Sequence, residues 1–68
     1  MKSESKKLGE NLKNIRTLKA ISQGDIARSL DVSRGFISNI ENGKTNPTLE
    51  TIARLAKAVG VSTNELLK

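Results

Sequence analysis

Arg34, Ser38 and Asn39 are the residues of this 68-residue chain whose types and spacing are best suited to binding chemistry. Arginine can donate two hydrogen bonds to the O6 and N7 atoms of guanine, and asparagine can pair a donor and an acceptor with adenine. A serine hydroxyl can serve most partners. On a helix these three side chains lie on one side together with Gly35, and Ser33 directly precedes that helix. These five residues are our candidates for contacting DNA base edges.

Two short helices joined by a tight turn must position these side chains. Ser22 is suited to cap a helix, and Asp25 follows at the spacing of a capping box, so the first helix should begin at about Gln23. Ser33 is a second cap, and the next helix should cover residues 34–41. Because only about three residues separate the helices, the pattern predicts the sharp crossing of a helix-turn-helix.

Apolar residues recur on the opposite face of each predicted helix, which is therefore expected to be buried. The residues expected to be buried are Ile26, Ala27, Leu30, Phe36, Ile37 and Ile40. The residues that remain on the solvent side are Arg34, Gly35, Ser38, Asn39 and Asn42. The first turn of the second helix can enter a major groove about 12 Å wide. Gly35 either permits close approach to DNA or reflects crowding, and both interpretations stay open.

The segment resembles the helix-turn-helix of the lambda and 434 repressor and Cro family, also called the XRE family. The family pattern is matched in order by Ser22-Gln23, Ile26-Ala27, Val32-Ser33, Ile37-Ser38, Glu41-Asn42-Gly43-Lys44, Pro47 and Leu49 to Ala53. The resemblance covers most of the chain. It implies a compact, all-α lambda-repressor-like domain of five helices over residues 6–68, in which helices 2 and 3 form the helix-turn-helix.

Two residues depart from what this family pattern favours. Asp31 stands where the family usually has glycine in a left-handed turn, and we expect the turn to survive because aspartate tolerates that conformation. Gly24 lies early in the first helix of the motif, where its low helix propensity could loosen Gln23. The resemblance implies that Gln23 contacts phosphate, so Gly24 bears on the strength of that contact.

The polar loop over residues 42–46 is a candidate for holding the DNA backbone. Side chains of Asn42, Lys44 and Thr45, with nearby backbone N–H groups, can hydrogen-bond phosphate oxygens and so set the register of the reading helix. The alternative is that this loop only connects two helices. The resemblance also implies a structural ion pair between Arg16 and Glu41.

Flanking segments are expected to complete the scaffold. Leu8, Leu12, Ile15 and Leu18 form one apolar stripe on a helix from about Lys6 to Lys19. Residues 1–5 are expected to be a flexible tail. A helix capped by Thr48 should end at Gly60, and Ser62 to Glu65 has the pattern of a capping box that opens a last short helix.

The last short helix suggests a dimer interface. Val61, Leu66 and Leu67 cannot all be covered by a single turn, and leftover apolar surface often marks a partner. We therefore expect a homodimer, formed in solution or only on DNA, that binds an inverted repeat with half-site centres about 10 base pairs apart. The alternative is that one or both leucines close the core of the monomer.

Composition excludes several classes of function. The chain has no cysteine or histidine, so disulfides, thiolate sites and imidazole chemistry are absent, and we predict no catalysis, metal or cofactor. The sequence has no apolar run of about 20 residues, so we expect a cytoplasmic, nucleoid-associated protein that does not enter membranes. The net charge of +5 suits an anionic partner but could equally reflect a solvated surface.

The sequence thus favours a sequence-specific regulator of transcription that binds double-stranded DNA. Such a protein represses by occupying promoter DNA or activates by contacting RNA polymerase. The alternative is an antitoxin or other protein-interaction module with secondary DNA binding, although we do not expect this chain to carry the toxin-binding extension that antitoxins usually have. Non-specific binding to nucleoid or membrane surfaces is disfavoured because the lysines are spread over several predicted helices.

Overall fold

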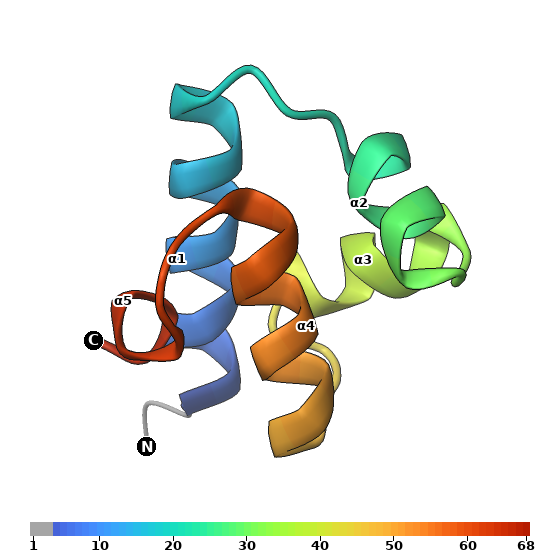
Figure 1. The fold of residues 1–68 in the computed structure, drawn as a ribbon. Helices are drawn as coiled ribbons and strands as arrows, with labels where there is room; N and C mark the ends of the chain where they lie inside the picture. The colour runs from blue at the N-terminus through green and yellow to red at the C-terminus, as the bar shows by residue number, and fades with distance from the viewer. Residues whose placement is uncertain (1–3) are drawn as a thin grey trace.

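The computed structural model describes residues 4–68, which form five α-helices and no strand. The helices are α1 (Glu4–Leu18), α2 (Gln23–Leu30), α3 (Arg34–Glu41), α4 (Leu49–Val59) and α5 (Thr63–Leu67). In Figure 1, α2 and α3 lie on one side of the molecule, α1 and α5 on the other, and α4 between them. The expected all-α architecture, with α2 and α3 as the helix-turn-helix, is confirmed.

Hydroxyl side chains set where four of the helices begin. Ser22, Ser33, Thr48 and Ser62 each accept a hydrogen bond from the backbone N–H three residues later. These bonds satisfy N–H groups that have no partner inside the helix. At Ser22 the capping box is complete, because the Asp25 carboxylate also accepts the Ser22 N–H.

The turn between α2 and α3 keeps its expected conformation although it lacks glycine. Asp31 adopts the left-handed region, at φ 61° and ψ 46°, and its N–H donates to the carbonyls that end α2. The aspartate therefore tolerates the conformation that the family usually gives to glycine. Gly60 ends α4 in the same way, at φ 75°.

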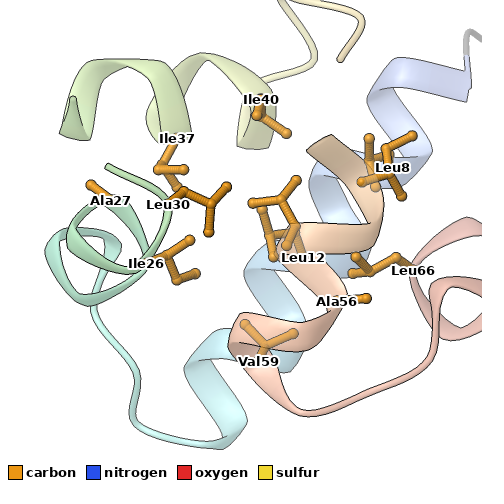
Figure 2. Close-up of a cluster of buried hydrophobic side chains, with 12 residues drawn as sticks. Leu8, Leu12, Ile26, Ala27, Leu30, Ile37, Ile40, Ala56, Val59 and Leu66 are labelled. Atoms are coloured by element: carbon orange, nitrogen blue, oxygen red, sulfur yellow. The ribbon is translucent and has the colours of Figure 1, made fainter. Parts of the chain in front are cut away.

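A single apolar core lies between the helices (Figure 2). Its fully buried large side chains are Leu12, Ile26, Ile37, Ile40, Leu55, Val59 and Leu66. Because they come from all five helices, α2 and α3 are held in place by the whole domain. Phe36 is only partly buried and packs against the edge of this core.

The first helix differs from the prediction at both ends. It begins at Glu4, so the expected tail of residues 1–5 includes two helical residues; residues 1–3 lie outside the described range. The Ser5 hydroxyl donates to the Asn46 side chain at 2.6 Å, which ties the start of α1 to the loop after α3. Leu18 is 86% exposed, so its assignment to the buried stripe was wrong. It is the last residue of α1, and the chain leaves the helix in a turn at Lys19 and Ala20.

A glycine allows α1 to pack directly on the end of α3. Gly9 is buried, and a Cβ atom placed on it would lie 2.3 Å from the carbonyl oxygen of Ile40 and 2.6 Å from that of Glu41. Real Cβ atoms essentially never come this close to another heavy atom. The two backbones are therefore in contact, which fixes the position of α3 against α1.

Candidate nucleic-acid interface

The face of α3 that points away from the core carries most of the predicted base-reading residues. Arg34, Gly35 and Asn39 are exposed, and Ser38 is half-buried. The Ser33 hydroxyl accepts the Phe36 N–H at 3.1 Å as the helix cap, which leaves its own proton free to donate. Four of the five residues thus lie on the first two turns of α3, and Ser33 caps its start.

An open cleft of about 650 Å³ lies beside this face, between α1, α2 and α3. Four of the predicted DNA-contacting residues line it: Gln23, Arg34, Ser38 and Asn42. Lys44 and Thr45 lie outside it, on the loop that follows α3, where Lys44 is exposed and Thr45 half-buried. The remaining candidates, Ser33, Gly35 and Asn39, are not among its lining residues.

The cleft is basic, because its lining holds more cations than carboxylates. Its lining cations are Lys13, Arg16, Arg28 and Arg34, and Glu41 is the one carboxylate among the lining residues that the structure describes. Sequence reasoning missed Lys13 and Arg28 as parts of this surface. They belong to different helices, so only the packing of α1 against α2 and α3 brings them to one place.

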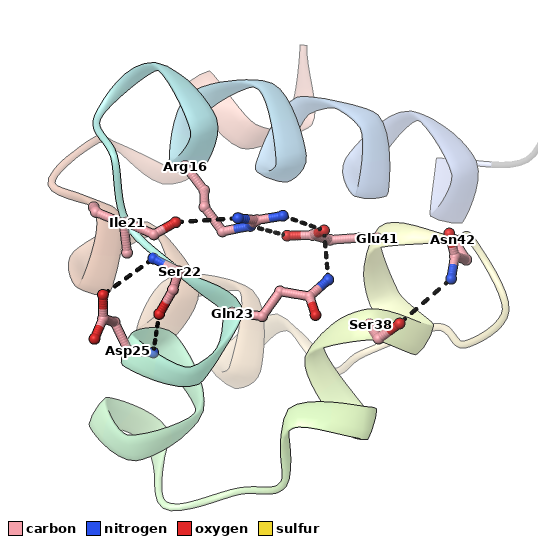
Figure 3. A network of polar contacts seen from close by, with 8 residues as sticks. All are labelled: Arg16, Ile21, Ser22, Gln23, Asp25, Ser38, Glu41 and Asn42. Atoms are coloured by element: carbon pink, nitrogen blue, oxygen red, sulfur yellow. Dashed lines mark hydrogen bonds and ion pairs between the residues drawn. The ribbon is translucent and has the colours of Figure 1, made fainter.

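Glu41 is held by side chains from two other helices (Figure 3). The Arg16 guanidinium donates to both carboxylate oxygens of Glu41, at 2.6 and 3.0 Å, and also to the carbonyl oxygen of Ile21 at 3.1 Å. The expected ion pair between Arg16 and Glu41 is therefore present, and the Glu41 side chain is only 2% exposed. This pair joins α1, the end of α3 and the turn before α2.

Gln23 completes the network and is positioned by it. Its Nε2 atom donates to Glu41 Oε1 at 2.9 Å. Because an ionised carboxylate accepts but cannot donate, the amino group of the amide must face Glu41. The other N–H of that amino group has no partner within residues 4–68. The predicted phosphate-binding residue is thus tied to the ion pair at the base of the cleft.

Opposing effects set the charge of Glu41. Burial raises the pKa of its carboxyl, but hydrogen bonds from Arg16 and Gln23 and the attraction of Arg16 and Lys13 outweigh it, so the net pKa lies below its ordinary value. The hydrogen bond to Glu41 raises the pKa of Arg16 against the effect of burial. Both groups stay ionised, and Arg16 offsets the one negative charge facing the cleft.

Arg34 differs from the other arginines of the chain. Arg16 is bonded to Glu41, Arg28 to Asp25 at 2.5 Å, and Arg54 to the Leu30 carbonyl at 2.9 Å. Within residues 4–68, Arg34 has no hydrogen bond or ion pair. Its five N–H donors are therefore available to an external partner.

The expected dimer residues are only partly available at the surface. Leu66 is completely buried in the core, so its assignment to a dimer interface was wrong: α5 folds back on α1, where the Asn11 amide donates to the Leu66 carbonyl at 2.8 Å. Val61 is partly buried against the core, and Leu67 is 42% exposed. Leu67 remains as the main apolar side chain that α5 exposes.

Residues 4–68 contain no group of three or more acidic, histidine or cysteine side chains placed to hold a metal ion. Across the same residues, no helix is both long and apolar enough to cross a membrane.

Comparison with known proteins identifies the family. A family model described as helix-turn-helix matches residues 12–66. The chain is 37% identical over 62 residues to the HTH-type transcriptional regulator DdrOP3 of Deinococcus deserti, an alignment that covers 91% of this chain and 48% of DdrOP3. The chain therefore spans about half the length of that regulator.

Solved structures of restriction-modification controller proteins have the same fold. C.AhdI from Aeromonas hydrophila superposes with a TM-score of 0.86 at 32% identity, covering 91% of this chain and 94% of C.AhdI. C.Esp1396I, solved as a tetramer in complex with its natural 35-base-pair operator, gives a TM-score of 0.81 at 28% identity, and the match covers 100% of both chains. The sequence motif, the five-helix fold and these matches agree, and the chain belongs to the XRE family of helix-turn-helix proteins.

Proposed function

We propose that this protein is a sequence-specific regulator of transcription that binds double-stranded DNA and inserts α3 into the major groove. The observation that carries the proposal is the exposed face of α3, with its unpaired Arg34, beside a cleft whose lining holds four cations and one carboxylate, Glu41, which is paired with Arg16. Relatives named as HTH-type transcriptional regulators, and the operator complex of C.Esp1396I, support it.

Affinity and specificity come from different residues in this proposal. Gln23, Asn42, Lys44 and Thr45 contact phosphates and fix the register of α3, and the release of counterions supplies much of the affinity. Arg34 and Asn39 carry the donors and acceptors that distinguish guanine and adenine, and Ser33, Gly35 and Ser38 shape the same surface. Lys13 adds positive charge along the cleft, and Arg28, which is paired with Asp25, adds further N–H donors.

The active form is proposed to be a homodimer, assembled in solution or on DNA. The tetramer of C.Esp1396I on its operator is consistent with regulators of this fold acting as oligomers. Leu67 and Val61 are the apolar side chains near α5 that remain for such a contact. The dimer acts in the cytoplasm, by occupying promoter DNA or by contacting RNA polymerase.

Selection from a pool of randomised DNA duplexes at near-physiological salt tests the proposal. Enrichment of an inverted repeat, with half-site centres about one helical turn apart, is expected. Binding without enrichment would reject sequence-specific recognition. The absence of binding would favour the protein-interaction module of the antitoxin type, which a co-purifying toxin would identify.

A further inference from the structure

Gly24 has no structural reason to be glycine in the free protein. It is the second residue of α2, and it is not among the glycines with positive φ. A Cβ atom placed on it would meet its nearest neighbours at 3.6 to 3.8 Å, which is ordinary van der Waals contact. Glycine nevertheless lowers helix stability relative to alanine. Neither backbone conformation nor a clash of the Cβ atom therefore excludes alanine at this position.

The space beside Gly24 is occupied by the side chains of two arginines. The nearest atom to the added Cβ would be Cδ of Arg34, at 3.6 Å, and Nη1 of Arg28 would lie at 3.8 Å. A methyl group fits between them. Any longer side chain must share this space with the stem of Arg34 or with the guanidinium of Arg28. All three residues line the basic cleft.

The two arginines differ in how firmly they are held. Arg28 donates to the Asp25 carboxylate, whose other oxygen accepts the Ser22 N–H of the capping box. Arg34 has no polar partner within residues 4–68, so only contacts along its stem restrict where its guanidinium points. A longer side chain at residue 24 would therefore displace Arg34 more readily than Arg28.

We propose that Gly24 is a specificity-positioning residue: without a side chain, it leaves the first turn of α2 open to the stem of Arg34 and so sets the direction of that guanidinium toward the DNA base edge. The inference rests on the proposed function, in which Arg34 reads a base. Gly24 itself contacts no base. It acts through Arg34, across the gap between the two helices of the motif.

The test compares variants at residue 24 on the operator obtained by selection and on operators altered at each base pair. Gly24→Leu is expected to lower discrimination at one base position by about 5-fold to 150-fold, the range that one arginine–guanine pair supplies. That position must be the one that Arg34→Ala relaxes. Gly24→Gln, which also has a long side chain, should give the same pattern if the leucine variant folds poorly. Gly24→Ala should keep full discrimination and raise the Tm.

Ser29→Leu is the matched control, because Ser29 is an exposed residue of the same helix and does not line this cleft. It should leave affinity and base preference unchanged. Circular dichroism of every variant separates loss of folding from loss of discrimination.

A double-mutant cycle with Arg34→Ala decides the mechanism. If Gly24 acts through Arg34, Gly24→Leu should reduce affinity little further in the Arg34→Ala background. A full additional loss there would overturn the proposal and indicate a direct clash with DNA. Unchanged discrimination in Gly24→Leu and Gly24→Gln would also overturn it. Failure of the wild-type protein to select any sequence would instead reject the proposed function, so the two failures are distinguishable.

Discussion

At the scale of single residues, Arg34 and Lys44 are proposed to contribute different parts of DNA binding. Arg34 presents a planar fork of donors that matches a guanine edge, whereas Lys44 is a flexible point charge on the loop after α3. Arg34→Ala should cost about 1–3 kcal/mol on the preferred operator and relax preference at one base pair. Lys44→Ala should weaken binding to all sequences alike. It should also reduce the steepness with which the logarithm of the binding constant falls with the logarithm of the salt concentration, by about 1. Titrations at several salt concentrations measure both effects; retention of full base preference by the Arg34 variant would contradict its assignment.

Glu41 should contribute far more to stability than an exposed glutamate. Its removal leaves Arg16, which is only 16% exposed, without its carboxylate partner, and leaves the Gln23 amide without its acceptor. Breaking a buried pair can cost about 3–5 kcal/mol, and each kcal/mol shifts Tm by about 4–8 °C in a domain of this size. We expect Glu41→Ala to lower Tm by at least about 10 °C, by the same estimate. Glu50→Ala is the control, since Glu50 is exposed in the first turn of α4. Equal small losses in thermal unfolding would show that the pair is not stabilising.

The same carboxylate should make stability depend on pH in the acid range. The pKa of Glu41 is lower in the folded protein than the ordinary value of a glutamate, so its stabilising contribution is present above that ordinary pKa and is lost as pH falls through the folded pKa. The pKa of Asp25 is also lowered, first by its hydrogen bond from the Ser22 backbone, and it acts in the same direction. Tm measured between pH 7 and pH 3 should therefore fall toward acid. Glu41→Gln should show a shallower fall; an identical pH profile would exclude Glu41 as the main group.

At the scale of helices, two helical glycines should respond in opposite ways to the same substitution. Gly9→Ala places a methyl group 2.3 Å from the Ile40 carbonyl, so α1 and α3 must separate, and we expect a loss of about 3 kcal/mol or more. Gly35→Ala meets only the Ser33 hydroxyl, at 3.8 Å, and should stabilise α3 by up to about 1 kcal/mol. Urea unfolding of both variants checks the contrast. A mild effect of Gly9→Ala would mean that the contact between α1 and α3 can relax.

At the scale of the whole molecule, the proposed dimer predicts that core residues and interface residues of α5 respond differently to substitution. Leu66 is completely buried, so Leu66→Ala should destabilise the monomer by about 2–5 kcal/mol. Leu67 is 42% exposed, so Leu67→Glu should leave Tm nearly unchanged but weaken self-association and binding to the two-half-site operator. Sedimentation with and without operator DNA distinguishes the two. Unchanged assembly of the Leu67 variant would place the dimer contact elsewhere.

Half-site spacing provides an independent test of the same dimer. Inserting five base pairs between the half-sites turns the second site by about half a helical turn, so two reading helices related by a two-fold axis can no longer meet both sites. Affinity should fall to that of a single half-site. An insertion of ten base pairs restores the face of the duplex but changes the separation, and a rigid dimer should not tolerate it. Equal binding to all spacings would indicate independent monomers.

Much of the fold could be predicted from local sequence because its signals act over a few residues. The caps Ser22, Ser33 and Thr48 occupy the starts that the sequence predicts, since a side-chain oxygen satisfies the free N–H groups of its own helix. Apolar spacing identified the buried faces of α2, α3 and α4 for a similar reason. Apolar spacing failed for Leu18, because the spacing of residues along one helix does not reveal how far the neighbouring helices extend beside it.

The candidate site was only partly predictable. Residue chemistry and family resemblance suggested the reading face of α3 and the pairing of Arg16 with Glu41, which lie 25 residues apart. Nothing local indicated that Gln23 donates to that pair or that Lys13 and Arg28 share its cleft. These relations depend on how α1 crosses the helix-turn-helix, which the close contact at Gly9 allows.

Two further parts of the chain, the turn between α1 and α2 and the last helix α5, also have features that local sequence does not predict. Ala20 adopts a left-handed conformation, at φ 59°, which an alanine in the sequence does not predict. The turn is held by two hydrogen bonds between Arg16 and Ile21, one from the Arg16 side chain and one to the Arg16 backbone carbonyl. Leu66 and Leu67 are chemically identical neighbours, yet one is buried and the other exposed. The sequence by itself determined the helices, their caps and the chemical types on α3. Only the tertiary structure decided which side chains share the cleft and which leucine remains outside the core, because burial depends on contacts between residues far apart along the chain.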